Sequence, residues 1–301
     1  MSTTNFQWKG ACLLLTAGCL IFAWTGSRGS RALAEGSVHA VLLNSSGLTE
    51  SSGVAQIGPV IWTHNDSGDV PRLFAFAHDG SLLGQFTVRG AQAIDWEDIC
   101  AFERDGKRYL AVGDIGDNSA RRESVRIYVI HIPELPDLLG LGELTVQSTF
   151  EIRYPTGAVN CEALAYDPLS RSFLLATKEL IYSRLYRVAA ETLIGTQFTQ
   201  AQFIGSLILP LVTGGDISPD GQQLVLSTYG PGCLLQRSLD GAYQGTGWQT
   251  HGKHAPHLFA LPLRLQGESI GFSEDGQRLW LTSEEVPTPL FNIPVPKPWR
   301  L

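Results

Sequence analysis

The sequence predicts an all-β fold, and three observations support this prediction. A short segment with a polar start and an apolar continuation occurs five times along the chain. Asp-Gly pairs, which accept the positive φ angles of tight hairpin turns, lie between the apolar segments. No stretch combines a helical apolar period with helix caps, and residues 188–195 (VAAETLIG) have room for only one or two helical turns.

The repeated unit is a strand, a turn and a second strand, followed by a third strand. The first strands are expected at 50–55, 95–102, 160–167, 212–221 and 267–276. The second strands are expected at 60–66, 109–118, 173–179, 224–230 and 279–285. The third strands are expected at 72–80, 125–132, 184–191, 233–241 and 290–295, which leaves room for a fourth strand in every unit.

One aligned position marks the start of each repeat, and its spacing predicts the architecture. This position is occupied by Ser52, Glu97, Glu162, Thr213 and Glu268. The spacing is close to the about 40 to 50 residues of a four-stranded propeller blade. We therefore predict a single β-propeller of five four-stranded blades, closed by pairing of an early strand at 37–44 with the last blade. An irregular sixth blade in residues 241–265 is the alternative.

Composition sets the class of protein. The chain has 301 residues, of which 44% are apolar and 17% charged, as expected for a domain with a hydrophobic core. A formal charge of −7 without any Lys/Arg run argues against nucleic acid as a partner. The chain contains no G-x-S-x-G, H-E-x-x-H or P-loop motif, and no G-x-G-x-x-G that opens a helix. We expect a monomer.

The N-terminal residues 1–34 resemble an export signal. Lys9 precedes an uncharged apolar run at 11–26, and Ala32-Leu33-Ala34 is a suitable cleavage site before Glu35. The expected domains are thus a signal peptide at 1–34 and a propeller at 35–301, in a secreted or periplasmic protein. The alternatives are a membrane anchor formed by residues 11–26, and lipidation at Cys19.

Three cysteines remain in the predicted propeller, and an odd number does not make a disulfide framework. Cys100 and Cys161 lie at equivalent places in adjacent repeats, so a disulfide between them is one alternative. Buried free thiols are the other. His251, His254 and His257 recur every three residues, but Gly252 and Pro256 preclude a helix that would align them as metal ligands, and an exposed loop is expected.

Topology places the polar ends of the predicted strands on one face of the ring. The first and second strands of a blade are antiparallel neighbours, so the start of one lies beside the end of the other. Polar residues cluster at both places in every repeat. Because first strands are innermost in a propeller, this face carries the mouth of the central channel. Asp95 and Glu97, two residues apart, are expected to share a strand face.

The predicted functional site is this acidic rim. Gathered carboxylates repel one another and raise their own pKa values unless a cation neutralises them. Calcium, with about six to eight oxygen ligands, suits a mixture of Asp, Glu and Asn better than zinc. The predicted metal ligands are Asp95, Glu97, Asp114, Asp117 and Glu162. The predicted catalytic residues are His64 and Asp66, and the predicted substrate-binding residues are Asn65, Asn118, Lys178, Tyr229, Glu268 and Glu284.

Structural roles compete with these assignments. Glu97, Glu162 and Glu268 could instead bind backbone amides of the neighbouring blade. Asp66, Asp114 and Asp117 could form Asx turns, since Asp and Asn favour tight turns. Trp62 and Trp96 are expected to pack between blades.

At these residues the chain resembles a family of secreted bacterial β-propeller proteins of unassigned function. The resemblance rests on WTHNDSGD, DWEDI, GDIGDN and EALAYD, which occur in this order between about residues 50 and 285. More distantly, the chain is similar to the periplasmic SdiA-regulated propellers and the β-propeller phytases, and the latter likeness implies calcium ions at the channel and its rim. The chain departs from the phytases because only Lys178, Arg121 and Arg122 are basic near the rim motifs.

Two functions are compatible with the sequence. The first is a calcium-dependent hydrolase of a phosphoester or lactone, in which the cation polarises the substrate and activates water. The second is a non-catalytic propeller that binds a protein or glycan at its rim, with a structural cation or none. The fold does not choose between them, because propellers host many unrelated functions.

Overall fold

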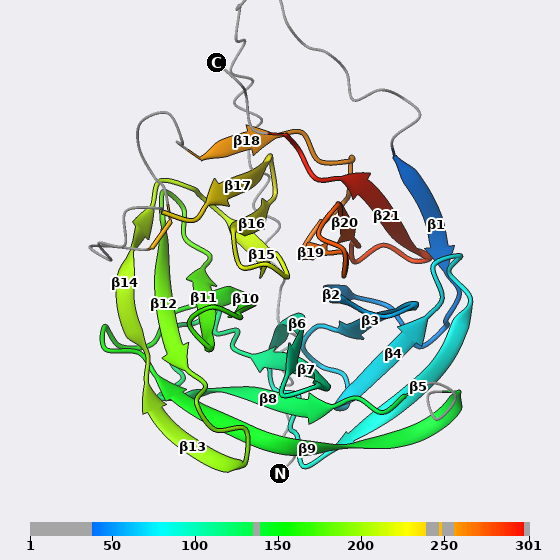
Figure 1. Cartoon of the computed structure of the whole chain (residues 1–301), viewed down its shortest axis with the longest axis horizontal. Helices are drawn as coiled ribbons and strands as arrows, with labels where there is room; N and C mark the ends of the chain where they lie inside the picture. The colour runs from blue at the N-terminus through cyan, green and yellow to red at the C-terminus, as the bar shows by residue number, and fades with distance from the viewer. Residues whose placement is uncertain (1–37, 135–138, 239–246, 249–255, 298–301) are drawn as a thin grey trace, which may run out of the picture. The chain divides into compact units, whose positions relative to one another are not determined.

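The computed structural model describes residues 38–134, 139–238, 247–248 and 256–297, which fold as strands and their connections. They belong to one compact unit, residues 35–301, in which sheets surround a common axis (Figure 1). The innermost strands contact one another in cyclic order, β2, β6, β10, β15 and β19, and then β2 again. The chain is therefore a five-bladed β-propeller, as the sequence predicts.

The strands run outward in chain order in four blades, whereas the fifth takes its outer strand, β1, from the start of the chain. The innermost strands are β2 (Ser51–Ile57), β6 (Trp96–Arg104), β10 (Cys161–Asp167), β15 (Val212–Ile217) and β19 (Gly271–Phe272). The second strands are β3 (Val60–Asn65), β7 (Lys107–Asp114), β11 (Ser172–Thr177), β16 (Gln223–Thr228) and β20 (Arg278–Leu281). The third strands are β4 (Arg72–Phe76), β8 (Val125–His131), β12 (Ser183–Ala189), β17 (Gly232–Gln236) and β21 (Thr288–Pro294). The outer strands are β5 (Leu82–Arg89), β9 (Gly140–Arg153), β14 (Gln202–Leu207), β18 (His257–Phe259) and β1 (His39–Leu43).

The ring closes through the first strand of the chain. β1 pairs antiparallel with β21, from His39 opposite Asn292 to Leu43 opposite Thr288, and so completes the fifth blade. This pairing covers the edge of β21, as the sequence predicts. The described part of 241–265 supplies β18 as the outer strand of the fourth blade, so it does not form a sixth blade.

The outer edge contains a feature that the repeats do not reveal. β9 is 14 residues long; its first half pairs parallel with β5 of the first blade, and its second half pairs antiparallel with β8 of the second. An extra strand, β13 (Gly195–Gln200), then adds parallel to the second half of β9. The first three blades are thereby joined at their outer edges (Figure 1).

The hydrophobic core is divided among the five interfaces between blades. Each of five apolar clusters combines buried side chains from two adjacent blades, which explains why the strands are apolar on both faces. Trp62 and Trp96 are fully buried between the first and second blades, as expected. Cys100, Cys161 and Cys233 are buried free thiols, and Cys161 donates to the Ala176 carbonyl of its own blade at 3.1 Å. The conceivable disulfide between Cys100 and Cys161 is therefore not formed.

Some sequence predictions fall outside the described residues. They concern the export signal or anchor at 1–34, with Cys12 and Cys19, and the residues His251, His254 and Asp240-Gly241. Among the residues that are described, no helix is long and apolar enough to cross a membrane. The Asp105-Gly106 pair forms the expected two-residue turn between β6 and β7, and both residues have positive φ.

Candidate functional site

The aligned position of the repeats is a β-bulge. The register shifts around Ser52 in β2, Glu97 in β6, Glu162 in β10 and Thr213 in β15, so each of these residues lacks a partner on the second strand. Glu268 holds the same place just before β19. A bulge re-aims its side chain and recurs beside functional sites. Here it occurs at the same end of four innermost strands.

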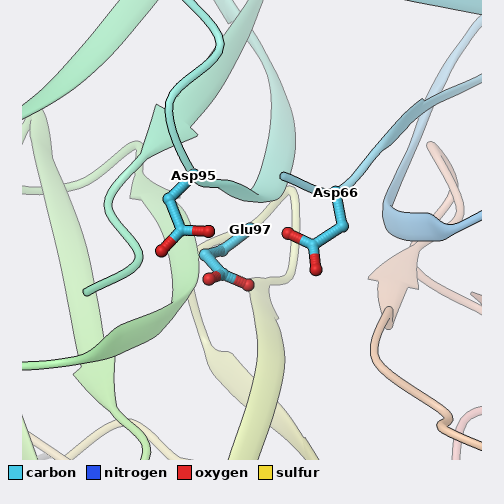
Figure 2. A group of neighbouring side chains, drawn as sticks. All are labelled: Asp66, Asp95 and Glu97. Carbon is cyan, nitrogen blue, oxygen red and sulfur yellow. The ribbon is translucent and has the colours of Figure 1, made fainter. Parts of the chain in front are cut away.

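The bulges and the adjoining loops bring six carboxylates together. Their oxygens form three overlapping groups, in each of which the chosen ligand atoms all lie within 4.8 Å of one another. The groups are Glu97 with Glu162 and Glu268, Asp66 with Asp95 and Glu97, and Asp66 with Glu268 and Glu284. Figure 2 shows the second group, in which the carboxylates of Asp66, Asp95 and Glu97 point toward a common space. The acidic rim expected from topology is present.

One side of the rim is balanced by a lysine. The ammonium of Lys178 lies 3.1 Å from Glu162 and 3.7 Å from Glu268. The Tyr229 hydroxyl donates to Glu268 at 2.6 Å, and Lys178 lies 4.9 Å from the centre of the Tyr229 ring. Asn160 also donates to Glu162 at 2.7 Å. The Glu162 and Glu268 side of the rim therefore has partners within the protein.

The other side has no such partner. Asp66, Asp95 and Glu97 take part in none of the ion pairs among the described residues. The Oδ1 atom of Asp66 is buried without a hydrogen-bond partner within the described structure. Glu97 is only 3% exposed. Buried charge of this kind is costly unless it is protonated or neutralised.

Burial and mutual repulsion shift the protonation of the rim. Burial, reinforced by neighbouring carboxylates, raises the pKa of Asp66 to about 7 and that of Glu284 to about 8. Burial also raises the pKa of Asp95, Glu162 and, most strongly, Glu97, which lies beside Glu162. Near neutral pH these carboxylates therefore retain part of their protons.

Gly116 forms one wall of the carboxylate group. A Cβ on Gly116 would overlap with Oε1 of Glu97 and would lie 2.5 Å from Oδ2 of Asp95. The Gly116 amide donates to the Asp95 carbonyl at 3.2 Å, which holds the loop in place. Only glycine permits this close approach of backbone to the two carboxylates. The sequence motif GDIGDN thus contributes its glycine to the site.

The alternative role of binding the neighbouring blade belongs to two aspartates that the sequence did not single out. Asp98 is fully buried, and its Oδ2 accepts the amides of Leu164 at 2.9 Å and Gly215 at 3.0 Å. Asp216 accepts the Phe272 amide of the fifth blade at 2.8 Å. Each also accepts the amide of the isoleucine that follows it. The Asp-Ile pair that recurs in two innermost strands is the sequence signal that could have identified these two aspartates.

His64 and Asn65 lie apart from the carboxylate group. His64 is completely buried, its ring packs edge-on against Trp96 at 5.5 Å, and Nδ1 lies 2.8 Å from the Asn65 carbonyl. Burial lowers the pKa of His64 to about 4. The Asn65 side chain accepts the amides of Thr49 and Glu50. Both residues hold the local backbone and do not face the space between the carboxylates.

Asp114, Asp117 and Asn118 also lie outside the three carboxylate groups. Asp114 pairs with Arg122 at 2.8 Å and accepts the Asp95 amide at 3.1 Å. Asp117 accepts the Arg122 amide at 2.7 Å, and Asn118 accepts from Asn160 at 3.1 Å. These three residues fix the loop that carries Gly116. Asp114 and Asp117 bind Arg122 and the Asp95 amide, not the amide two residues further on that an Asx turn would use, so these contacts are not the Asx turns offered as the alternative.

Arg264 is a further rim residue that sequence analysis missed. Its guanidinium donates to the carbonyls of Ser269 and Thr282, both at 2.8 Å, and to the Ser227 hydroxyl at 3.0 Å. Burial lowers its pKa to about 10, against the opposing effect of Glu268. Arg264 therefore links the fourth and fifth blades beside Glu268.

Comparison with known proteins adds little to this geometry. No protein-family model matches the chain, and no curated protein matches it in sequence. Similar solved structures include a chain of a mitotic checkpoint complex, at 14% identity and a TM-score of 0.39, covering 81% of this chain and 61% of that one. Another is the Kuenenia stuttgartiensis hydrazine synthase, at 10% identity and a TM-score of 0.43, covering 81% of this chain and 83% of that one. The propeller assignment rests on the strand pairing described above.

Proposed function

We propose that this protein is an exported β-propeller that binds a hard divalent cation, calcium by its ligand chemistry, through Asp66, Asp95 and Glu97 at the channel rim. Export is proposed from the N-terminal sequence pattern. The cation site is inferred from the convergence of three buried or half-buried carboxylates that form no ion pair among the described residues, while the charge of Arg122 only partly offsets the rise in the pKa of Asp95 (Figure 2).

The donor atoms suit calcium. Three carboxylates offer only oxygen, and calcium takes about six to eight oxygen ligands at flexible geometry. Typical zinc sites contain His or Cys ligands, whereas His64 and the described cysteines are buried and belong to none of the three carboxylate groups. Gly116 leaves space that a side chain would fill. Three carboxylates do not complete the coordination of calcium, so water or a ligand would occupy the remaining positions.

The test is a calorimetric titration of calcium chloride into chelator-treated protein. Wild type is expected to bind calcium and to melt at a higher temperature when loaded. Glu97→Gln and Asp95→Asn are expected to weaken binding by at least about tenfold, because each removes a ligand charge. Glu123→Gln is the matched control, an exposed carboxylate on the same face. Absence of calcium binding by wild type would overturn the proposal.

Hydrolysis is a second candidate, and the position of Glu284 favours it, since its carboxylate lies within 4.8 Å of the proposed calcium ligand Asp66. A general base works best when its pKa lies near the working pH, and in the metal-free protein burial raises the pKa of Glu284 to about 8. A bound calcium would polarise a phosphoester or lactone. Glu284 would accept the proton of the attacking water, a role that buried His64 does not have the access to perform.

This candidate is tested with aryl phosphoesters and aryl lactones in calcium and in chelator. Calcium-dependent turnover that Glu284→Gln abolishes and Glu285→Gln preserves would support it. The absence of turnover in protein shown to bind calcium would leave the non-catalytic function.

A partner-binding role is favoured by the apolar side chains around the rim. Loops on this face expose large apolar residues from every blade or from its connection to the next: Val70, Ile94, Leu180, Ile181, Tyr182, Ile208, Tyr229, Leu263, Leu265 and Val286. Large apolar side chains exposed around a charged centre are typical of a protein-binding face. A partner protein that binds in the presence of calcium should no longer bind the Ile208→Glu variant. The calcium affinity of this variant should equal that of wild type.

A further inference from the structure

A second cavity lies at the end of the channel opposite the acidic rim. It has a volume of about 300 Å³. All five innermost strands contribute to its wall through residues at or near their far ends, namely Ile57, Phe102, Tyr166, Ile217 and Phe272. A cavity of this size is at the lower end of the range for small-molecule sites.

This cavity is separate from the carboxylate rim. Between the two, Asp98 reaches from β6 to the amides of Leu164 in β10 and Gly215 in β15. The innermost strands also approach closely here, since a Cβ on Gly53 would lie 2.7 Å from the Ile99 amide nitrogen. The axis is therefore filled by protein between the two ends. A ligand in the cavity would not touch a cation at the rim.

Part of the cavity wall is apolar and includes aromatic rings. Phe102 and Tyr166 stack with ring centres 4.0 Å apart and are 8% and 4% exposed. Phe272, Ile57 and Ile217 continue this surface. Such a wall buries the apolar body of a small ligand by the hydrophobic effect.

The charges around the cavity are mainly negative. Asp216 lines it, and its carboxylate accepts two backbone amides, those of Ile217 and Phe272, both at 2.8 Å, with no ion pair to a cationic side chain in the described part of the chain. Glu103 and Glu274 stand exposed at the entrance. Arg108, the cationic side chain of this wall, is 2.5 Å from Glu134 and also interacts with Glu103 and Glu274, so the entrance carries one positive charge against three carboxylates.

Each carboxylate oxygen of Asp216 can accept a further hydrogen bond. Burial raises the pKa of Asp216 to about 7, so a cation that contacts it would favour the ionised form.

We propose that this cavity binds a small organic cation, a primary amine carried on an aromatic or branched apolar group. The ammonium donates hydrogen bonds to Asp216, and the apolar group packs against Phe102, Tyr166 and Phe272. Glu103 and Glu274 attract the cation to the entrance. This site is independent of the proposed calcium site.

The proposal is tested with three ligands of one shape, titrated into the whole protein and followed by ligand-observed NMR. The probes are 2-phenylethylamine, 2-phenylethanol and 3-phenylpropionate. The amine is expected to bind, the alcohol to bind at least about tenfold more weakly because it lacks the charge-assisted hydrogen bond, and the acid not to bind. Binding of the amine should be equal in calcium and in chelator.

Variants locate the site. Asp216→Asn removes the charge and should weaken amine binding by at least about tenfold. Because Asp216 also joins two blades, Glu274→Lys at the exposed entrance is the second variant and should weaken binding severalfold by repulsion. Glu97→Gln at the rim is the control and should bind the amine as wild type does. The proposal is overturned if the amine does not bind, if the acid binds equally well, or if Glu274→Lys and a folded Asp216→Asn both leave binding unchanged.

Discussion

The backbone of Gly116 lies directly against the carboxylate of Glu97, so a side chain on Gly116 and the present position of that carboxylate exclude each other. This contact crosses between two segments of the second blade, the loop after β7 and the bulge in β6. The position of the Glu97 carboxylate therefore requires a glycine at residue 116 in the loop.

Gly116→Ala should therefore impair the site more than the fold. The carboxylates of Glu97 and Asp95 are the ends of flexible side chains and would move aside, which disperses the ligands. We expect calcium affinity to fall about 10 to 100-fold with a small change in melting temperature. Gly230→Ala is the control, since a Cβ there meets only ordinary contact, 3.6 Å from the Thr228 hydroxyl. Equal affinities of wild type and Gly116→Ala would contradict this account.

The stability of the calcium-free protein should fall as the pH rises from 6.5 to 8. Folding raises the pKa of Asp66 to about 7 and of Glu284 to about 8, so over this range the folded state holds more protons than the unfolded state. Stability is then lost with rising pH. His64, whose pKa is lowered to about 4, is neutral in both states over most of this range and adds little.

We expect a loss of roughly 1–3 kcal/mol, measured by urea denaturation in chelator. Saturating calcium should remove the part due to Asp66 and Glu284, because the cation replaces their protons, and Glu284→Gln should reduce the slope. The part due to Asp216, whose pKa burial also raises to about 7, should remain because Asp216 lies away from the rim. A free energy of unfolding that rises with pH in chelator would show that folding does not raise the pKa values of the rim carboxylates.

Lys178→Met should destabilise the calcium-free protein and enlarge the effect of calcium. The ammonium stands between Glu162 and Glu268 with its side chain only 18% exposed. Removing it leaves two carboxylates unpaired, at a cost of about 3 kcal/mol. The gain in melting temperature on adding calcium should then exceed that of wild type. Lys107→Met, on the opposite face, is the control. If calcium raised the melting temperature of Lys178→Met no more than that of wild type, this would count against Lys178 as the internal counter-ion.

Asp98→Asn should weaken the fold and spare the cation site. An amide group cannot accept all three of the backbone amides that the Asp98 carboxylate now accepts. We expect a loss of about 2–4 kcal/mol in the free energy of unfolding, with unchanged calcium affinity per folded molecule. Asp79→Asn, in an exposed turn, should cost less than about 1 kcal/mol. If Asp98→Asn lost calcium binding while fully folded, Asp98 would belong to the site.

The repeat pattern predicted the blades well because it records local chemistry. Apolar second strands, Asp-Gly turns and the polar residue at each bulge follow from backbone conformation and burial, which every blade repeats. The long β9 and the added β13 had no such signal, since their pairing joins segments from different repeats. The same limit applies to Asp216, whose partner Phe272 is contributed by the next blade.

The sequence by itself determined the five-bladed ring, its closure by the first strand, and the face on which carboxylates gather, because strand period and antiparallel order fix these features. The tertiary structure alone decided how those carboxylates divide. Lys178 forms ion pairs with Glu162 and Glu268, whereas Asp66, Asp95 and Glu97 form none among the described residues. It also placed His64 in the interior. Such outcomes depend on distances between side chains of different blades, which no pattern along one strand encodes.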